Sequence, residues 1–180
     1  ERRIWCFPAV DLDTGHWTEG VIGFVQTCRR GGLPAAVERL RSGDGSHVWF
    51  FFSSPVAASS ARKMGCYLLT ETMSRRHELS MESYDRLFPS QDTMPAGGFG
   101  NLIALPFQSR PREKGNSVFV DDDFYPYEDQ WAYLSQINRL SRPELLSLVA
   151  EAATAGPIFA VRLPSTREAD EPSAAFASRR

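Results

Sequence analysis

The chain has 180 residues, of which 42% are hydrophobic and 23% are charged, and its formal net charge is −2. This composition is typical of one sizeable folded domain or two small lobes, and it excludes a low-complexity chain. A net charge close to zero also excludes an overall basic field, so any site for nucleic acid must be a local patch.

The three cysteines, Cys6, Cys28 and Cys66, form neither a CxxC zinc pattern nor a disulfide framework, which fits a reducing cytosol. No apolar run approaches the roughly 18 residues of a membrane span, and no signal peptide stands at the N-terminus. We therefore expect a cytoplasmic protein without a membrane partner. Because the chain starts at Glu1 and not at Met, we also expect an N-terminally truncated part of a longer polypeptide.

The first predicted element is a buried strand from Ile4 to Val10, in which Pro8 favours an edge position or a bulge. It leads into Asp11 and Asp13, which point to the same side of an extended backbone because they are two residues apart. Two neighbouring carboxylates repel each other unless they are solvated or share a cation. An all-oxygen pair favours Mg²⁺ or Mn²⁺ over zinc. The alternative is a turn in which an aspartate caps the following helix.

A helix is predicted next, because apolar residues recur at helical spacing from Trp17 to Cys28 and Gly31-Gly32 follows as a stop signal. Residues Pro34 to Arg41 and Val48 to Phe52 then read as the two strands of a hairpin. The second is the most hydrophobic strand of the chain, and we expect it at the centre of the sheet.

The hairpin turn contains two glycines, Gly43 and Gly45, that let the backbone come close to a ligand. Ser42 and His47 supply side-chain donors at the two ends of the turn, and Arg41 is placed to reach a phosphate. Exposed amides, a hydroxyl and an imidazole together suit a phosphate chain. The alternatives are an ordinary hairpin with a solvated tip and, for Arg41, a solvated strand residue.

Ser54 and Pro55 then predict the N-cap and the first position of a helix that runs to about Met73. The order strand, helix, hairpin, helix is a βαββα unit. It predicts an α+β sandwich with its helices on one face of the sheet.

The segment from Ser74 to Gly100 is irregular and polar, and it predicts a loop. A strand is predicted from Leu102 to Leu105. The basic residues Arg110, Arg112 and Lys114 follow, either as a contact for a polyanion or as a solvated run of charges.

A further strand from Ser117 to Asp121 ends in a run of aspartates. A carboxylate at Asp121 could complete a metal site with Asp11 and Asp13, and the alternative is a turn rich in helix-capping acids. Helices are predicted from Asp129 to Ile137 and from Arg142 to about Ala153. We expect a catalytic domain over residues 1–160 and a linker or disordered tail over 161–180, where Ser, Thr, Glu, Pro and Arg dominate.

Together, an acidic pair at a strand end, a Ser-Gly-x-Gly-x-His hairpin and a strand-terminal aspartate resemble the three motifs of the archaeo-eukaryotic primase-polymerases. Longer stretches resemble the primase domain of the TOTE conflict systems, and the resemblance covers roughly Trp5 to Leu140. These stretches are Arg41–Trp49, Tyr84–Asp92, Gly97–Gln108 and Asp129–Trp131.

The resemblance implies an α+β, two-lobed primase core in which a βαββα unit is joined to an RRM-like mixed sheet, with the active site in the cleft between the lobes. It implies a template-directed nucleotidyl transferase with two divalent ions, Mg²⁺ or Mn²⁺, held by Asp11, Asp13 and Asp121. Ser42, His47 and the amides of Gly43 and Gly45 would hold the triphosphate, since either protonation state of His47 can donate a hydrogen bond. Arg41 and Lys114 would add positive charge.

The implied partners are nucleoside triphosphates, a DNA or RNA template, and helicase and nuclease modules on the same longer polypeptide of a prokaryotic defence system. One alternative is a catalytically inactive module that senses nucleotide or nucleic acid. Another is a phosphodiesterase, for which the sequence offers no identifiable general base. The primase hypothesis requires Asp121 on the same side of the sheet as Asp11 and Asp13, and a His47 ring that is not buried in the core.

Overall fold

The computed structural model describes residues 4–5, 8–13, 17–76, 86–89 and 103–155. The tail expected over residues 161–180 and the domain limit expected at residue 160 lie outside these ranges. Parts of the family-like stretches at 84–92 and 97–108 also lie outside them.

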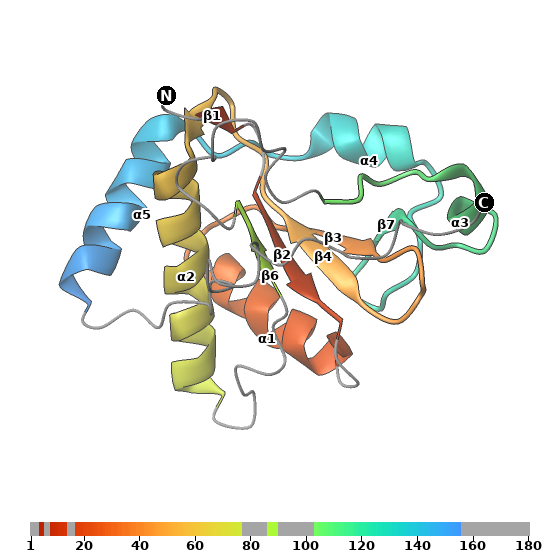
Figure 1. The fold of residues 1–180 in the computed structure, drawn as a ribbon, viewed down its shortest axis with the longest axis horizontal. Coiled ribbons are helices and arrows are strands. Elements are labelled where there is room, and N and C mark those ends of the chain that lie inside the picture. The colour runs from red at the N-terminus through yellow and green to blue at the C-terminus, as the bar shows by residue number, and fades with distance from the viewer. Residues whose placement is uncertain (1–3, 6–7, 14–16, 77–85, 90–102, 156–180) are drawn as a thin grey trace, which may run out of the picture.

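The described chain contains short strands and helices of very different length (Figure 1). The helices are α1 (Trp17–Arg30), α2 (Ala58–Arg75), α3 (Ser109–Arg112), α4 (Gln130–Gln136) and α5 (Arg142–Thr154). The strands are β1 (Ile4–Trp5), β2 (Ala9–Leu12), β3 (Ala36–Arg39), β4 (Ser46–Trp49), β5 (Val56–Ala57), β6 (Arg86–Phe88) and β7 (Val118–Val120).

Five strands form one sheet in the order β6-β2-β4-β3-β7, and β1 pairs separately with β5. Every ladder of the five-stranded sheet is antiparallel, so the described strands do not form the mixed sheet that the family resemblance implied. The predicted central position of the second hairpin strand is confirmed by β4, which pairs with β2 on one side and β3 on the other. The predicted bounds, Val48 to Phe52, were wrong, because β4 covers Ser46–Trp49. All four residues of β4 are buried, as expected for a strand with covered faces.

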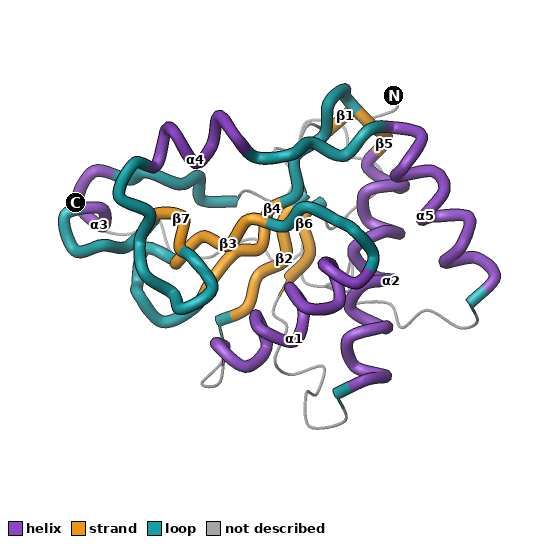
Figure 2. The backbone as a smooth tube through the Cα atoms, turned by 180° about the vertical axis from the view of Figure 1, so that it is seen from behind, coloured by secondary structure: helices purple, strands orange, loops and turns teal. Residues whose placement is uncertain are grey.

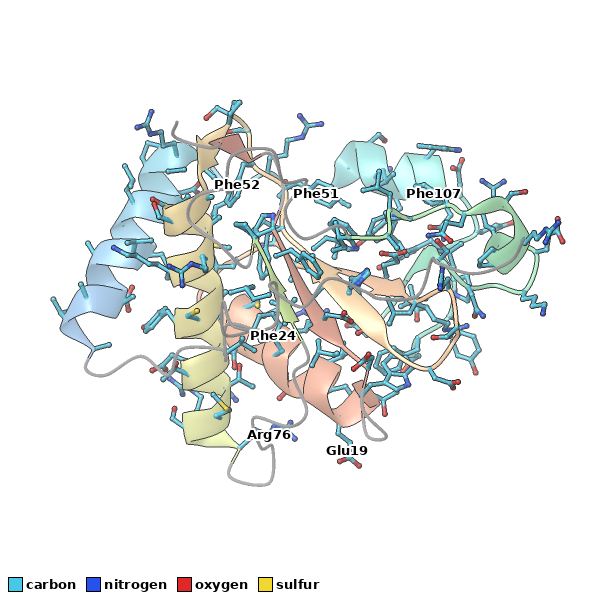
Figure 3. The ribbon with its side chains drawn as sticks, viewed as in Figure 1. Glu19, Phe24, Phe51, Phe52, Arg76 and Phe107 are labelled. Atoms are coloured by element: carbon cyan, nitrogen blue, oxygen red, sulfur yellow. The ribbon has the colours of Figure 1, made fainter. Side chains whose placement is uncertain are left out.

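The predicted βαββα unit is confirmed by β2, α1, β3, β4 and α2, and its helices lie on one face of the sheet (Figure 2). Valine and leucine side chains of the strands meet the helices on this face. Phe24 of α1 (Figure 3) makes an edge-to-face contact there with Phe50. The main core therefore lies between the sheet and α1 and α2, and α5 packs against α2 on the outer side. The residues that the five-stranded sheet contributes to this core are Val10, Leu12, Val37, Val48, Leu87, Val118 and Val120.

The opposite face of the sheet carries a second, smaller apolar cluster formed by Ala9, Ala36, Trp49 and Phe119. Helix α4 and the segment before α3 pack against this cluster, and Phe107 lies beside α4 with its ring centroid 4.8 Å from that of Trp131 (Figure 3). This second cluster takes one residue each from β2, β3, β4 and β7. Polar side chains of β2, β3 and β4 occupy the neighbouring part of the same face.

The predicted end of the first helix is confirmed, because α1 stops at Arg30 and Gly32 follows with φ +67°. A left-handed residue after a helix is the conformation that glycine adopts at low cost. The last turn is closed by backbone bonds from Gly32 to Arg29 (3.0 Å) and from Leu33 to Cys28 (2.9 Å).

The sequence prediction for the start of the second helix was wrong. The structure places the N-cap of α2 at Ala57, with no side-chain capping bond, and not at Ser54. The reason is pairing over a long distance: Val56 and Ala57 form β5 with Trp5 and Ile4 before the helix begins. A ladder between segments more than fifty residues apart is not visible in a local capping pattern.

Two further expectations for the middle of the chain were also wrong. Within the segment expected to be a loop, Arg86–Phe88 forms β6 and pairs with Ala9–Asp11 of β2. The strand expected over 102–105 is not assigned in its described part, residues 103–105, where Leu105 is 56% exposed. The strand neighbour of β2 is therefore a three-residue segment whose polar surroundings concealed it.

Candidate functional site

A row of cross-strand partners places polar side chains side by side on the sheet. Asp11 of β2 lies opposite His47 of β4, His47 lies opposite Glu38 of β3, and Glu38 lies opposite Phe119 of β7. Partners in register share one face of a sheet. Since Phe119 belongs to the second cluster, the row lies on the face opposite α1 and α2.

The His47 side chain lies between two carboxylates. Its Nδ1 is 3.1 Å from Glu38 Oε2, and its Nε2 is 3.7 Å from Asp11 Oδ1, which is too long for a direct hydrogen bond. The ring also makes an edge-to-face contact with Trp49. His47 is only 4% exposed, yet it lines a cavity on the polar part of the face and is not surrounded by the hydrophobic core.

Glu38 is a residue that the sequence reasoning missed. It is 2% exposed, and its Oε2 accepts a second hydrogen bond from Trp49 Nε1 at 2.7 Å. Its Oε1 accepts one from Ser117 Oγ at 3.4 Å. The register of the hairpin could have identified Glu38 from the sequence, because a turn between Arg39 and Ser46 places Glu38 directly opposite His47.

The hairpin turn packs directly on the acidic motif. Gly45 has φ +153°, and a Cβ atom there would lie 2.9 Å from the Leu12 carbonyl oxygen and 3.0 Å from Asp13 Cα. Only glycine tolerates this approach without displacement. The turn and the acidic pair, which are about thirty residues apart in the sequence, therefore form one structural unit.

Hydrogen bonds inside the turn limit what its backbone can offer a ligand. The Gly43 amide donates to the Leu40 carbonyl at 3.0 Å, and the Asp44 amide donates to Ser42 Oγ at 3.3 Å. The Gly43 amide, expected from the family resemblance to hold a triphosphate, is therefore already engaged. Since the Ser42 oxygen acts as the acceptor, its hydroxyl proton can still be donated to a ligand.

A cavity of about 220 Å³ opens beside this unit. Its polar lining comes from β2, β3, β4 and the turn, and it comprises Asp11, Glu38, Arg41, Ser42 and His47. Its apolar lining comprises Leu40, Phe88, Ile103 and Ala104. Four of the residues predicted from the sequence thus meet around one cavity, with acidic groups beside a basic residue and a hydroxyl.

Asp13 is exposed and follows the last residue of β2, two positions after Asp11. Asp11 itself is largely covered, with 14% of its side chain accessible. The alternation of a strand directs both carboxylates to the same side. Two oxygen ligands from one strand end fit Mg²⁺ or Mn²⁺, which proteins often bind through one or two carboxylates together with the phosphates of a substrate.

The structure does not bring Asp121 to this pair. Asp121 follows β7, and both β4 and β3 lie between β7 and β2. Three strand spacings of about 4.8 Å amount to roughly 14 Å. Asp121 Oδ1 instead accepts hydrogen bonds from the amides of Asp123 (3.0 Å) and Tyr125 (2.8 Å). Among the described residues, no three histidine, cysteine, aspartate or glutamate side chains gather in a way that could hold a metal.

The predicted basic residues lie in and after α3, next to the hairpin tip. Arg110, Arg112 and Lys114 are exposed and do not line the cavity. Asn116, two residues beyond Lys114, donates from Nδ2 to the Arg41 carbonyl at 3.4 Å. Its Nδ2 would also lie 3.1 Å from a Cβ atom at Gly43. The basic loop is therefore attached to the turn, although Lys114 does not enter the cavity.

The protein-family model described as "TOTE conflict system, Archaeo-Eukaryotic Primase domain" matches residues 2–148 of the chain. No curated protein matches the chain. In the described part of the chain, no helix is long and apolar enough to cross a membrane. The matched region contains β2, the hairpin turn and all the residues around the cavity. Since the family model matches most of its length, the chain belongs to the archaeo-eukaryotic primase domain family of the TOTE conflict systems.

Proposed function

We propose that this domain is a nucleotidyl transferase that extends DNA or RNA on a template, using nucleoside triphosphates and Mg²⁺ or Mn²⁺. The observation that supports this most is the shared cavity lined by Asp11, Arg41, Ser42 and His47. It places one candidate metal ligand, Asp11, next to groups that can hold phosphates. The family, whose members act on nucleotides and nucleic acids, supports the same function.

Asp11 and Asp13 are the proposed metal ligands. A divalent metal bound there would activate the attacking hydroxyl and neutralise the charge of the leaving pyrophosphate. The Gly45 backbone, packed on Leu12 and Asp13, sets the distance between these carboxylates and the turn. The acidic pair and the substrate phosphates would then share a cation, which removes their mutual repulsion.

The turn supplies the groups that would orient the triphosphate. Arg41 can form paired hydrogen bonds with phosphate oxygens, and the Ser42 hydroxyl can donate one more. His47 Nε2 is the ring nitrogen on the Asp11 side of the cavity. Positive charge from Arg41 and from nearby Lys114 would offset the charge of the phosphate chain.

The role of Asp121 as a further metal ligand stays a prediction, as does the two-lobed architecture. With the strand order found here, Asp121 would have to approach Asp11 across two strands. This observation favours a second candidate function, an inactive module that binds nucleotide or nucleic acid within a defence protein. We further propose that helicase and nuclease modules act with the domain on the same polypeptide.

Primer extension on a labelled primer-template with Mn²⁺ tests the proposal. We expect extension by the wild type and its loss in Asp11→Ala and in His47→Ala, because the first removes a metal ligand and the second a phosphate contact. Asp123→Ala is the matched control and should retain activity, since Asp123 is exposed and does not line the cavity. Nucleotide binding without extension in every variant would instead establish the inactive binding module.

A further inference from the structure

We infer that Glu38 is a positioning residue that fixes which nitrogen of His47 faces the substrate. The inference deepens the proposed function and rests on it for the identity of the ligand, a triphosphate. Glu38 does not reach the reacting atoms itself, because it acts through the His47 ring. Its burial and its three hydrogen-bonding neighbours carry the argument.

The contacts of Glu38 leave its carboxylate as an acceptor only. Trp49 Nε1 carries a hydrogen and must donate, at 2.7 Å to Glu38 Oε2. His47 Nδ1 lies 3.1 Å from the same oxygen. A buried carboxylate at this distance from a ring nitrogen is satisfied when that nitrogen also donates. The Nδ1 proton of His47 is therefore held toward Glu38.

Holding the proton on Nδ1 determines what Nε2, the other ring nitrogen of His47, can offer a ligand. With Nδ1 protonated, a neutral ring presents Nε2 as an acceptor, whereas a protonated ring presents Nε2–H as a donor. On this inference, only the protonated ring can donate from Nε2 to a phosphate. The inference therefore narrows the sequence-based expectation that either protonation state of His47 can donate.

The arrangement differs from a purely structural hydrogen bond. If Glu38 only filled space between β3 and β4, it would not select a tautomer of His47. The neutral ring would then favour the Nε2–H form, which is the commoner tautomer in water. Removing a structural contact would lower stability without changing that tautomer. The position of the ring proton is therefore the measurement that separates the two roles.

Three variants test the inference in the full chain. Glu38→Leu removes the acceptor at similar volume. Glu38→Gln keeps it, because the amide oxygen can accept from His47 and Trp49 while the amide nitrogen faces Ser117. Trp49→Phe is the matched control, since it removes the other donor to the same Oε2. Ring ¹⁵N shifts of His47, recorded near pH 9 where an ordinary histidine is neutral, report which nitrogen carries the proton.

We expect the Nδ1–H tautomer in the wild type, in Glu38→Gln and in Trp49→Phe, and the Nε2–H tautomer in Glu38→Leu. An Nε2–H tautomer in the wild type would overturn the inference, whether or not the variants fold.

The two proposals fail in different ways. If His47→Ala binds the triphosphate as tightly as the wild type, the phosphate-binding role of His47 is wrong, while the tautomer spectra still decide the role of Glu38.

Discussion

Gly45 is the residue at which the hairpin turn and the acidic motif depend most directly on each other. Its φ of +153° and the short distances to Leu12 and Asp13 leave no room for a side chain. Glycine is therefore required at this position for two reasons: the backbone conformation, and the close contact with the Leu12–Asp13 backbone, which we call its contact role.

We predict that Gly45→Ala destabilises the domain and weakens triphosphate binding, because the new methyl group displaces the Leu12–Asp13 backbone. Gly32→Ala is the matched control: φ is +67° there, but no atom lies within 4 Å of the position that its methyl group would take. The control variant should lose only about 1–2 kcal/mol of folding free energy, which is the cost of placing alanine in left-handed backbone. Chemical denaturation measures the stability of both variants, and nucleotide titration measures their affinity. Equal losses of stability and of affinity would contradict the contact role.

At the residue scale, the sequence predicted the site in part. Asp11, Ser42 and His47 were predicted from their spacing on strands and turns, which is local information, and the structure shows that they line one cavity. Glu38 was missed because its function comes from pairing across the hairpin, where one strand residue meets another. Asp121 was predicted beside Asp11 because both follow apolar strands, but a strand end carries no information about which strand will be its neighbour.

At the scale of single elements, helix α4 depends on an N-cap. Asp129 accepts hydrogen bonds from the amides of Trp131 (3.0 Å) and Ala132 (2.9 Å). The helix has no buried residue, so its partly buried side chains and its cap hold it against Phe119 and the second cluster. The sequence placed the helix correctly to within a residue because such a cap is a local signal.

We predict that Asp129→Ala lowers the free energy of unfolding by about 1 kcal/mol, the usual cost of losing such a cap. Hydrogen exchange of the α4 amides should accelerate as well. Glu128→Ala, a neighbouring exposed carboxylate, is the control and should change neither measurement. A loss of equal size in both variants would show that charge, and not the cap, stabilises α4.

Helix α5 begins with a capping box, in which Ser141 and Glu144 bond reciprocally to each other's backbone amides. Hydrogen bonds from Ser141 hold the pKa of the exposed Glu144 carboxyl below its usual range. A lowered carboxyl pKa contributes stability above the unfolded value, about 4.3, and that contribution is lost as the pH falls through the folded pKa.

We therefore predict that α5 is less protected from hydrogen exchange at pH 3 than at pH 6, after correction for intrinsic rates. Ser141→Ala should reduce this difference, because it removes the bonds that favour the ionised carboxyl. The same pH dependence in both proteins would show that Glu144 is not responsible.

At the scale of the whole molecule, the sequence predicted the βαββα unit but not the arrangement of the sheet. The unit follows from hydrophobic periodicity, which is a property of each segment. The antiparallel order β6-β2-β4-β3-β7 depends on pairing between distant segments, and it contains a strand that the local pattern concealed. Whole-molecule topology places the acidic pair, the turn and Glu38 together, and it separates Asp121 from them.

The central claim is that Asp11 and Asp13 share a divalent metal with a triphosphate held by the turn. Calorimetric titration of the full chain with a non-hydrolysable nucleoside triphosphate, with Mn²⁺ and without it, tests this claim most directly. We predict that Mn²⁺ tightens binding about tenfold or more, equivalent to about 1.4 kcal/mol, in the wild type and in Asp123→Asn. The gain should disappear in Asp11→Asn. Equal affinity with and without Mn²⁺ in the wild type, or an undiminished gain in Asp11→Asn, would contradict the account.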